Sequence, residues 1–243
     1  MSKRLEVQIW SDIACPWCYV GKRRFEAALA RFPQASEVQV VWRSFELDPS
    51  APRVRPHQDY AERLAAKYGM PRAQAQARIE QLVSVARAEG LSLNFTDIQP
   101  GNTFDAHRLL HFAHAQGKQH ELKERLLRAY LCEGQPIGEH ATLLKAAGDV
   151  ELDVDAAQAV LATDQFAREV REDQDLARRI GISGVPFFVL DQRYAVEGAQ
   201  PTETMLSALT RAYAELPALT QLSAAEGAVC GPDGCSPSTV SGD

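Results

Sequence analysis

The residues best suited to chemistry are two cysteines separated by two positions, in the segment Cys15-Pro16-Trp17-Cys18. Disulfide exchange needs a thiolate that attacks a disulfide and a second thiol that resolves the mixed disulfide formed in that attack. The spacing provides both, and we expect Cys15 to be the exposed nucleophile and Cys18 the resolving thiol. A structural disulfide or half of a zinc site has the same spacing, so the surrounding sequence must distinguish these alternatives.

The flanking residues place Cys15 at or just before the start of a helix. Leu5 to Trp10 alternate in polarity, which predicts a strand with one buried face, and Val20 to Phe32 have helical spacing. Pro16 fits the first helical turn, because the amide that it lacks would have no partner there. The amides at this end of a helix stabilise negative charge and lower the pKa of a thiol, which favours redox chemistry.

A second feature lies late in the chain, in the segment G-V-P-F at residues 184–187. A proline at the start of a predicted strand, after a β-branched residue, predicts a cis bond between Val185 and Pro186, with an ordinary trans proline as the alternative. A cis bond would turn the Val185 backbone toward a peptide that adds like an edge strand. We therefore expect Pro186 to close the active site, and Pro16, Trp17 and Val185 to contact the substrate.

The C-terminal segment carries another cysteine pair, Cys230 and Cys235, around a Pro-Asp-Gly turn sequence. About fourteen residues of linker separate this pair from the last predicted helix, and such a linker spans on the order of 20 Å. The pair is therefore predicted to reach Cys15 and act as a second redox couple. A disulfide that pins the tail and a weak metal site are the alternatives.

Other candidate groups are predicted to be structural. Cys132 stands alone at a helix end, which favours a buried and inert thiol. His107, His111 and His114 share one helix face with a spacing that can bind metal, but no carboxylate or cysteine nearby in sequence completes a site. We expect packing or domain-interface roles for these histidines, no metal site, and no cofactor beyond the cysteine pairs.

The order of predicted elements is β-α-β, a run of helices, and α-β-β-α, an α/β protein with an all-helical insertion. The predicted strands are residues 5–10, 37–45, 185–190 and 193–196, and the predicted helices are residues 20–32, 58–68, 72–89, 103–116, 121–132, 139–147, 155–180 and 201–216, the last capped by Thr202. About a hundred residues of helix are too many for a connecting loop. We therefore divide the chain into a sheet domain of residues 1–55 and 156–216, a helical insert of residues 56–155, and a flexible tail of residues 217–243.

These motifs, in this order, resemble the DsbA-like thioredoxin superfamily and specifically its FrnE-like cytoplasmic branch. The shared segments are W-S-D at residues 10–12, C-P-W-C at 15–18, N-T-F-D-A-H-R-L at 102–109, G-V-P-F at 184–187 and V-E-G-A-Q-P at 196–201. The resemblance implies a thioredoxin domain interrupted by a helical domain, redox chemistry at Cys15 and Cys18, and a cis proline at Pro186.

One departure concerns proton transfer: Ile9 stands where many thioredoxin-like enzymes carry a buried carboxylate. Asp12 is nearer to the cysteines but fits a capping role equally well, so no proton acceptor for Cys18 is assigned.

Composition narrows the class of protein. The net charge of -6 disfavours nucleic acid as a partner, and basic runs such as residues 22–24 are expected on solvated helix faces. No membrane span or signal peptide is expected, which favours the cytoplasm. The expected partners are protein or small thiol and disulfide substrates and a redox partner.

The competing functions are a glutathione-dependent kappa-class transferase or hydroxychromene-carboxylate isomerase, whose relatives usually lack the resolving cysteine, and a non-catalytic zinc protein. Neither the oligomeric state nor the net direction of exchange follows from the sequence.

Overall fold

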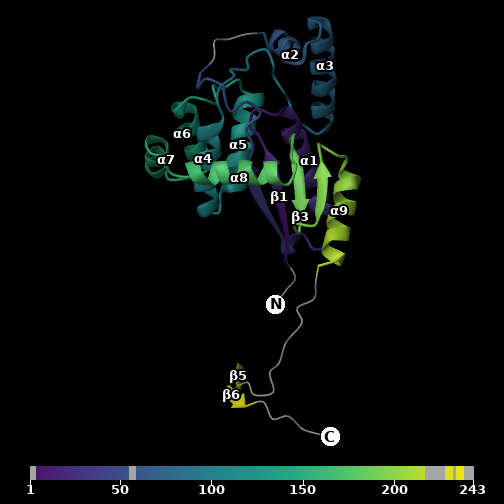
Figure 1. The fold of residues 1–243 in the computed structure, drawn as a ribbon, viewed down its shortest axis with the longest axis vertical. Coiled ribbons are helices and arrows are strands. Elements are labelled where there is room, and N and C mark those ends of the chain that lie inside the picture. Colours follow the sequence, from purple (N-terminus) through teal and green to yellow (C-terminus); the bar gives the residue numbers. More distant parts are fainter. Residues whose placement is uncertain (1–3, 55–58, 217–227, 232–233, 238–243) are drawn as a thin grey trace.

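A computed structural model describes residues 4–54, 59–216, 228–231 and 234–237, and its main body is a mixed sheet covered by helices (Figure 1). The strands are β1 (Leu5–Ser11), β2 (Val38–Ser44), β3 (Phe187–Leu190) and β4 (Tyr194–Glu197), in the order β2-β1-β3-β4. The β1 and β2 strands run parallel, with Ile9 opposite Trp42, whereas β3 is antiparallel to both of its neighbours. The predicted β-α-β start and late hairpin are therefore confirmed.

The two faces of the sheet carry different helices because side chains alternate along each strand. Helices α1 (Pro16–Arg31) and α9 (Thr202–Ala214) pack on one face, where Ile9 and Phe188 join a buried apolar cluster with Phe25 and Leu209. Helix α8 (Ala167–Arg179) covers the other face, on which Trp10 lies. The strand that leads to the cysteines is thus buried on both sides.

The predicted insert is observed as a body of helices between β2 and β3. Its helices are α2 (Tyr60–Tyr68), α3 (Arg72–Ala88), α4 (Phe104–Ala115), α5 (Gln119–Leu131), α6 (His140–Asp149) and α7 (Val154–Ala162). Their apolar core also takes in Ile13, Tyr19 and Val20, which flank the two cysteines. The cysteine segment therefore lies where the core of the insert meets the sheet domain.

The single helix predicted over residues 155–180 is wrong, because the chain breaks into α7 and α8. Phe166 has a left-handed backbone with φ of 61°. The Arg108 side chain donates to the carbonyls of Val160, Thr163 and Gln165, which closes the end of α7. Helix α7 then packs on α4 and α6, whereas α8 contacts α4 and β2. A side chain distant in sequence thus determines this break, and no local pattern reports it.

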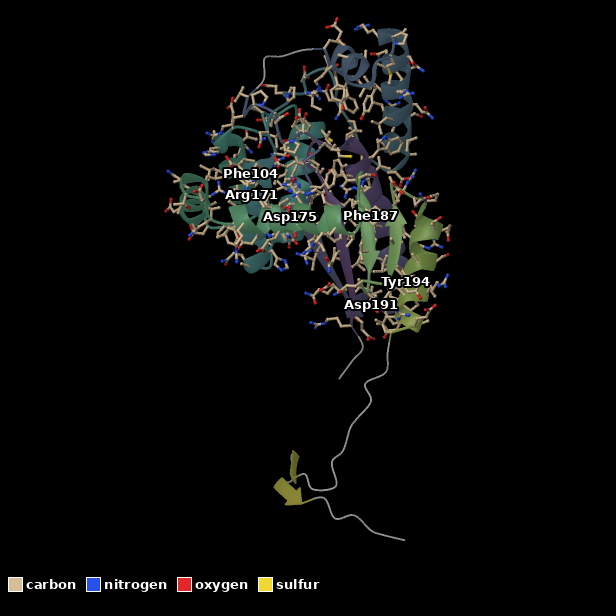
Figure 2. The ribbon with its side chains drawn as sticks, viewed as in Figure 1. Phe104, Arg171, Asp175, Phe187, Asp191 and Tyr194 are labelled. Atoms are coloured by element: carbon tan, nitrogen blue, oxygen red, sulfur yellow. The ribbon has the colours of Figure 1, made fainter. Side chains whose placement is uncertain are left out.

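Helix α8 connects the insert to the sheet domain. The guanidinium of Arg171 lies over the ring of Phe104 in α4, 5.0 Å from its centroid (Figure 2). The other end of α8 leads into Phe187 at the start of β3. One smaller correction concerns α9, whose cap is Pro201, since Thr202 is already the first helical residue.

The C-terminal segment contains a short antiparallel hairpin of β5 (Ala228–Gly231) and β6 (Gly234–Pro237). Its register pairs the backbones of Cys230 and Cys235. The predicted Pro-Asp pair of the turn, at residues 232–233, and the predicted linker at 217–227 lie outside the described residues. Among the helices of the described residues, none is both long and apolar enough to cross a bilayer.

Candidate active site

Cys15 is the N-cap of α1, as predicted, and Pro16 occupies the first helical position. The backbone amide of Cys15 donates to the Asp12 carbonyl over 3.3 Å, and the amide of Cys18 donates to the Cys15 carbonyl over 3.1 Å. The short turn after β1 therefore fixes the first sulfur at the positive end of the helix dipole.

The late proline segment meets this helix end across the fold. The Cys15 thiol donates to the Val185 carbonyl over 3.5 Å, and the peptide bond between Val185 and Pro186 is cis. Gly21 allows the close approach of Pro186, because a Cβ atom on this glycine would lie 2.8 Å from the proline Cγ. The amide of Gly198 donates to the Pro186 carbonyl over 2.8 Å and holds the segment from the hairpin side.

The expectation that Cys15 is exposed is wrong, since only 5% of its surface is accessible. Val185 covers the sulfur from one side, and Pro16 is itself buried. Trp17, in contrast, is 42% exposed. Cys15 borders a cavity of about 1070 Å³, which is also lined by Pro16, Trp17, Val185, Arg63 and Arg78. The Cys15 side chain is therefore reached through this cavity.

Cys18 lies behind Cys15 with 1% of its surface accessible. Burial raises the pKa of the Cys18 thiol well above its usual value, and its hydrogen bond and charge interaction with Cys15 raise it further. The positive charge of Lys123 acts in the opposite direction. Cys18 is thus held as a thiol next to the first sulfur, where a resolving group must stand.

Asp12 acts as a structural carboxylate at the end of β1. One oxygen accepts a hydrogen bond from the Leu47 amide over 2.8 Å, and the other lies 3.3 Å from Nε2 of His107. Burial raises the pKa of Asp12, but the hydrogen bond and charge interaction with His107 outweigh it and leave the pKa below its usual value. The geometry therefore favours the capping interpretation over a role in accepting the Cys18 proton.

Two of the three histidines of α4, His107 and His111, connect the insert to the sheet domain, as predicted. His107 contacts Asp12, and His111 Nε2 lies 3.0 Å from Asp173 and 3.1 Å from the Ser44 hydroxyl. His114 is exposed. In the described part of the chain, no group of three or more histidine, cysteine or carboxylate residues is arranged to hold a metal ion.

Two buried lysines were not identified from the sequence. Lys22, expected on a solvated helix face, has 1% of its side chain exposed and pairs with Glu26 and Glu124. Lys123 of α5 is fully buried, and its Nζ has no hydrogen-bond partner among the described residues. The burial of Lys123 could have been predicted from its position, because it lies three, four and seven residues before Leu126, Leu127 and Tyr130 and so shares their buried helix face.

Of the remaining cysteines, Cys132 does not line the cavity, and the side chains of Cys230 and Cys235 are outside the described part of the structure. Cys132 ends α5, is half-buried rather than buried, and does not line the cavity. Burial raises the pKa of its thiol and favours the protonated form. The side chains of Cys230 and Cys235 lie outside the description, which gives only the pairing of their backbones.

Comparison with known proteins gives consistent matches over most of the chain. The family model of the DSBA-like thioredoxin domain matches residues 6–210. An uncharacterized protein of Bacillus subtilis, YwbO, is 32% identical over 196 residues, which cover 76% of this chain and 86% of that protein. A probable DsbA oxidoreductase of Streptomyces coelicolor has a similar solved structure, with a TM-score of 0.86 and 45% identity over 96% of this chain and 99% of its own.

A more distant solved structure shares the fold alone. The cytosolic disulfide reductase DsbM of Pseudomonas aeruginosa superposes with a TM-score of 0.57 and 16% identity. The superposition covers 85% of this chain and 98% of that one.

Proposed function

Because the chain belongs to the DsbA-like thioredoxin family, we propose that it exchanges disulfides in proteins or small thiols through a Cys15–Cys18 couple. The observation that carries the proposal is the position of Cys15: the residue is the N-cap of α1, its thiol donates to the Val185 carbonyl, and it borders a cavity, while Cys18 is buried. The two thiols supply the redox equivalents themselves, so the proposed reaction needs no cofactor.

The proposed exchange proceeds in two steps. The Cys15 thiolate attacks one sulfur of a substrate disulfide, the substrate S–S bond breaks, and the released sulfur takes up a proton. The deprotonated sulfur of Cys18 then attacks Cys15 and displaces the second substrate thiol, leaving a Cys15–Cys18 disulfide. The substrate gains two electrons and two protons, and the reverse sequence oxidises a dithiol.

Substrate contacts are proposed at the rim of the cavity. The exposed ring of Trp17 offers an apolar surface next to Cys15, and Pro16 lies between them in the chain. The Val185 backbone is proposed to pair with an extended substrate segment, and Pro186 to fix the edge against which this segment lies. Arg63 and Arg78 also line the cavity and add positive charge to it, which favours substrates with acidic groups.

Cys230 and Cys235 are proposed as a second couple that exchanges with the first. Their backbones are direct partners in an antiparallel hairpin, which suits a disulfide closed across a tight turn. In this scheme the tail accepts or delivers electrons at Cys15 and thereby regenerates the active couple.

We also propose that the protein works in the cytoplasm, as the fold neighbour DsbM does. In a reducing compartment, the couple would act on substrates that have become oxidised. Fractionation of cells that express a tagged chain tests this part of the proposal, and recovery in the cell envelope would contradict it.

Insulin reduction and refolding of a scrambled disulfide protein test the function with four proteins: wild type, Cys15→Ser, Cys18→Ser, and the double variant Cys230→Ser/Cys235→Ser. We expect activity to fall about 1000-fold or more in Cys15→Ser, because no other group replaces the nucleophile. Cys18→Ser should accumulate mixed disulfides, since resolution fails. The tail variant should lose about threefold to tenfold with a thiol-regenerating partner present.

The matched control is Cys132→Ser, a cysteine that does not line the cavity and is expected to leave activity unchanged. Full activity in Cys15→Ser would disprove the proposed function. Full activity in Cys18→Ser would instead favour the glutathione-dependent alternative, which needs one thiol. Stoichiometric zinc in the purified protein, lost in the tail variant, would favour the zinc-binding alternative.

A further inference from the structure

The helical insert carries a buried lysine whose charge interacts with the two thiols. Lys123 is fully buried, and its Nζ makes no hydrogen bond within the described residues. Nζ lies 5.5 Å from the centroid of the Trp42 ring. Burying an amine without a hydrogen bond is costly, so the position of this group needs an explanation.

The groups whose charges act on this amine belong mainly to the site. They are Cys15, Cys18 and Lys22 of α1, and Asp12 after β1. The Asp12 oxygens already accept from Leu47 and contact His107, and Lys22 is held by Glu26 and Glu124. The two thiols are therefore the neighbours of Lys123 whose protonation changes during disulfide exchange.

We propose that Lys123 is the proton-transfer residue for Cys18. As Cys18 attacks the mixed disulfide on Cys15, the neutral Lys123 amine takes the proton that the Cys18 sulfur loses. The new bond joins Cys15 to Cys18, the bond between Cys15 and the substrate breaks, and the substrate leaves as a thiolate that is protonated from solvent. In the reverse direction the Lys123 ammonium returns the proton to Cys18. This inference rests on the proposed function.

The protonation energies of the two groups suit this exchange. Burial lowers the pKa of Lys123 to about 8, although Cys18, Asp12 and Cys15 act to raise it. Burial raises the pKa of Cys18, so the proton stays on Cys18 until the attack on the mixed disulfide begins, and the amine then acts as a general base. A base with a pKa near the working pH is an efficient proton acceptor, whereas Asp12, with its lowered pKa, is a poor one.

Nζ of Lys123 is not hydrogen-bonded to the Cys18 sulfur, so the proposed transfer includes a rotation of the long lysine side chain toward that sulfur. Ile9, on the strand that leads to the cysteines, is a buried aliphatic residue and exchanges no proton. The insert thus supplies, from α5, a group that the sheet domain lacks at that position.

The test separates attack by Cys15 from resolution by Cys18 in a single experiment. The full chain carrying Cys132→Ser, Cys230→Ser and Cys235→Ser is reduced and mixed with excess of the aromatic disulfide of nitrothiobenzoate. The first release of coloured thiolate reports attack by Cys15 and depends on reagent concentration. The second release reports resolution by Cys18 and does not. Both phases are measured from pH 6 to 10 (roughly the range in which thiols and this amine titrate).

We compare Lys123→Met, which keeps the length of the side chain without its amine, with Lys22→Met as a buried lysine control. In Lys123→Met the second phase should slow about 100-fold near neutral pH, whereas Lys22→Met should stay within about threefold of the parent. The pH profile is the diagnostic readout. The parent rate should level off near pH 8, whereas the Lys123→Met rate should keep rising toward the higher pKa of Cys18.

Two results would overturn the inference: an unchanged second phase in Lys123→Met, or a slower one whose pH profile matches the parent. The second result would assign Lys123 a structural role through Trp42. The proposed function fails separately, if the first phase persists when Cys15→Ser is added to the parent. A normal first phase with an unaffected second phase therefore rejects Lys123 alone.

Discussion

Helix α1 meets α5 in two adjacent regions that handle buried charge in opposite ways. At the middle of α1, Nζ of Lys22 lies 2.5 Å from Glu26 and 2.6 Å from Glu124, and Arg23 pairs with both carboxylates. Near the start of α1, the charge of Lys123 interacts with the two thiols, and its Nζ makes no hydrogen bond in the described structure. Lys123 and Glu124 are consecutive residues of one helix, yet Glu124 completes an ion-pair cluster, whereas Nζ of Lys123 lies over the ring of Trp42.

The difference separates structural charge from reactive charge. For a buried ammonium with two carboxylate partners, the attraction of the carboxylates offsets the free energy lost on leaving water, so the ammonium is not stabilised by losing its proton. A buried amine without such partners is held near its titration point and is available for proton exchange. Lys22 and Lys123 are both buried, so burial does not distinguish them. The number of carboxylate partners does, and the lysine without such partners is the one proposed to exchange a proton.

The largest predicted effect comes from breaking the ion-pair cluster. Glu124→Gln should lower the free energy of unfolding by about 2 kcal/mol, because Lys22 keeps only Glu26 and the buried ammonium loses half of its compensation. Lys123→Met should be neutral or stabilise by about 1 kcal/mol, because it removes a buried amine that has no hydrogen-bond partner among the described residues. Urea unfolding of the two variants measures both values. Equal destabilisation of the two would show that the regions do not differ.

A smaller effect is expected at Gly21, where α1 approaches Pro186 on the reactive side. Gly21→Ala should destabilise by about 1 kcal/mol, since the close contact costs more than the gain in helix propensity. It should also slow exchange, because the segment that contacts Cys15 through Val185 must shift. The control is Gly148→Ala in α6, whose Cβ would meet only a Val154 methyl at 3.3 Å. Loss of activity in the control, or none in Gly21→Ala, would contradict this explanation.

The smallest predicted effect is a pH dependence of the stability that Glu26 contributes to the ion-pair cluster at the middle of α1. Burial raises the pKa of Glu26, but His120 and Lys22 outweigh it and lower the pKa to about 2. Because the folded pKa lies below the unfolded value, the stabilisation is complete above about pH 5 and is lost as the pH falls toward 2. The difference in urea midpoint between wild type and Glu26→Gln should therefore shrink from pH 6 to pH 3 (roughly the range of this loss). Glu80→Gln, on the exposed face of α3, is the control and should show no such trend.

The sequence predicted the elements and the cysteine geometry because these depend on local patterns. Alternating polarity located β1, and Pro16 located the first turn of α1. The break near Phe166 was missed because the guanidinium of Arg108, distant in sequence, ends α7. The burial of Cys15 was missed for a similar reason, since the covering carbonyl comes from Val185. Lys22 and Lys123 were missed because their charge indicates exposure, and only tertiary partners explain why they are buried.

Under the proposed function, the covered position of Cys15 limits which disulfides can react. An attacking sulfur must line up behind the bond that breaks, and here that approach is confined to the cavity beside Val185. A disulfide in the interior of a stably folded partner cannot be brought into this recess, whereas one on a protruding or unfolded segment can. Under the proposed function, the protein is therefore expected to exchange accessible disulfides and to leave native, packed ones intact.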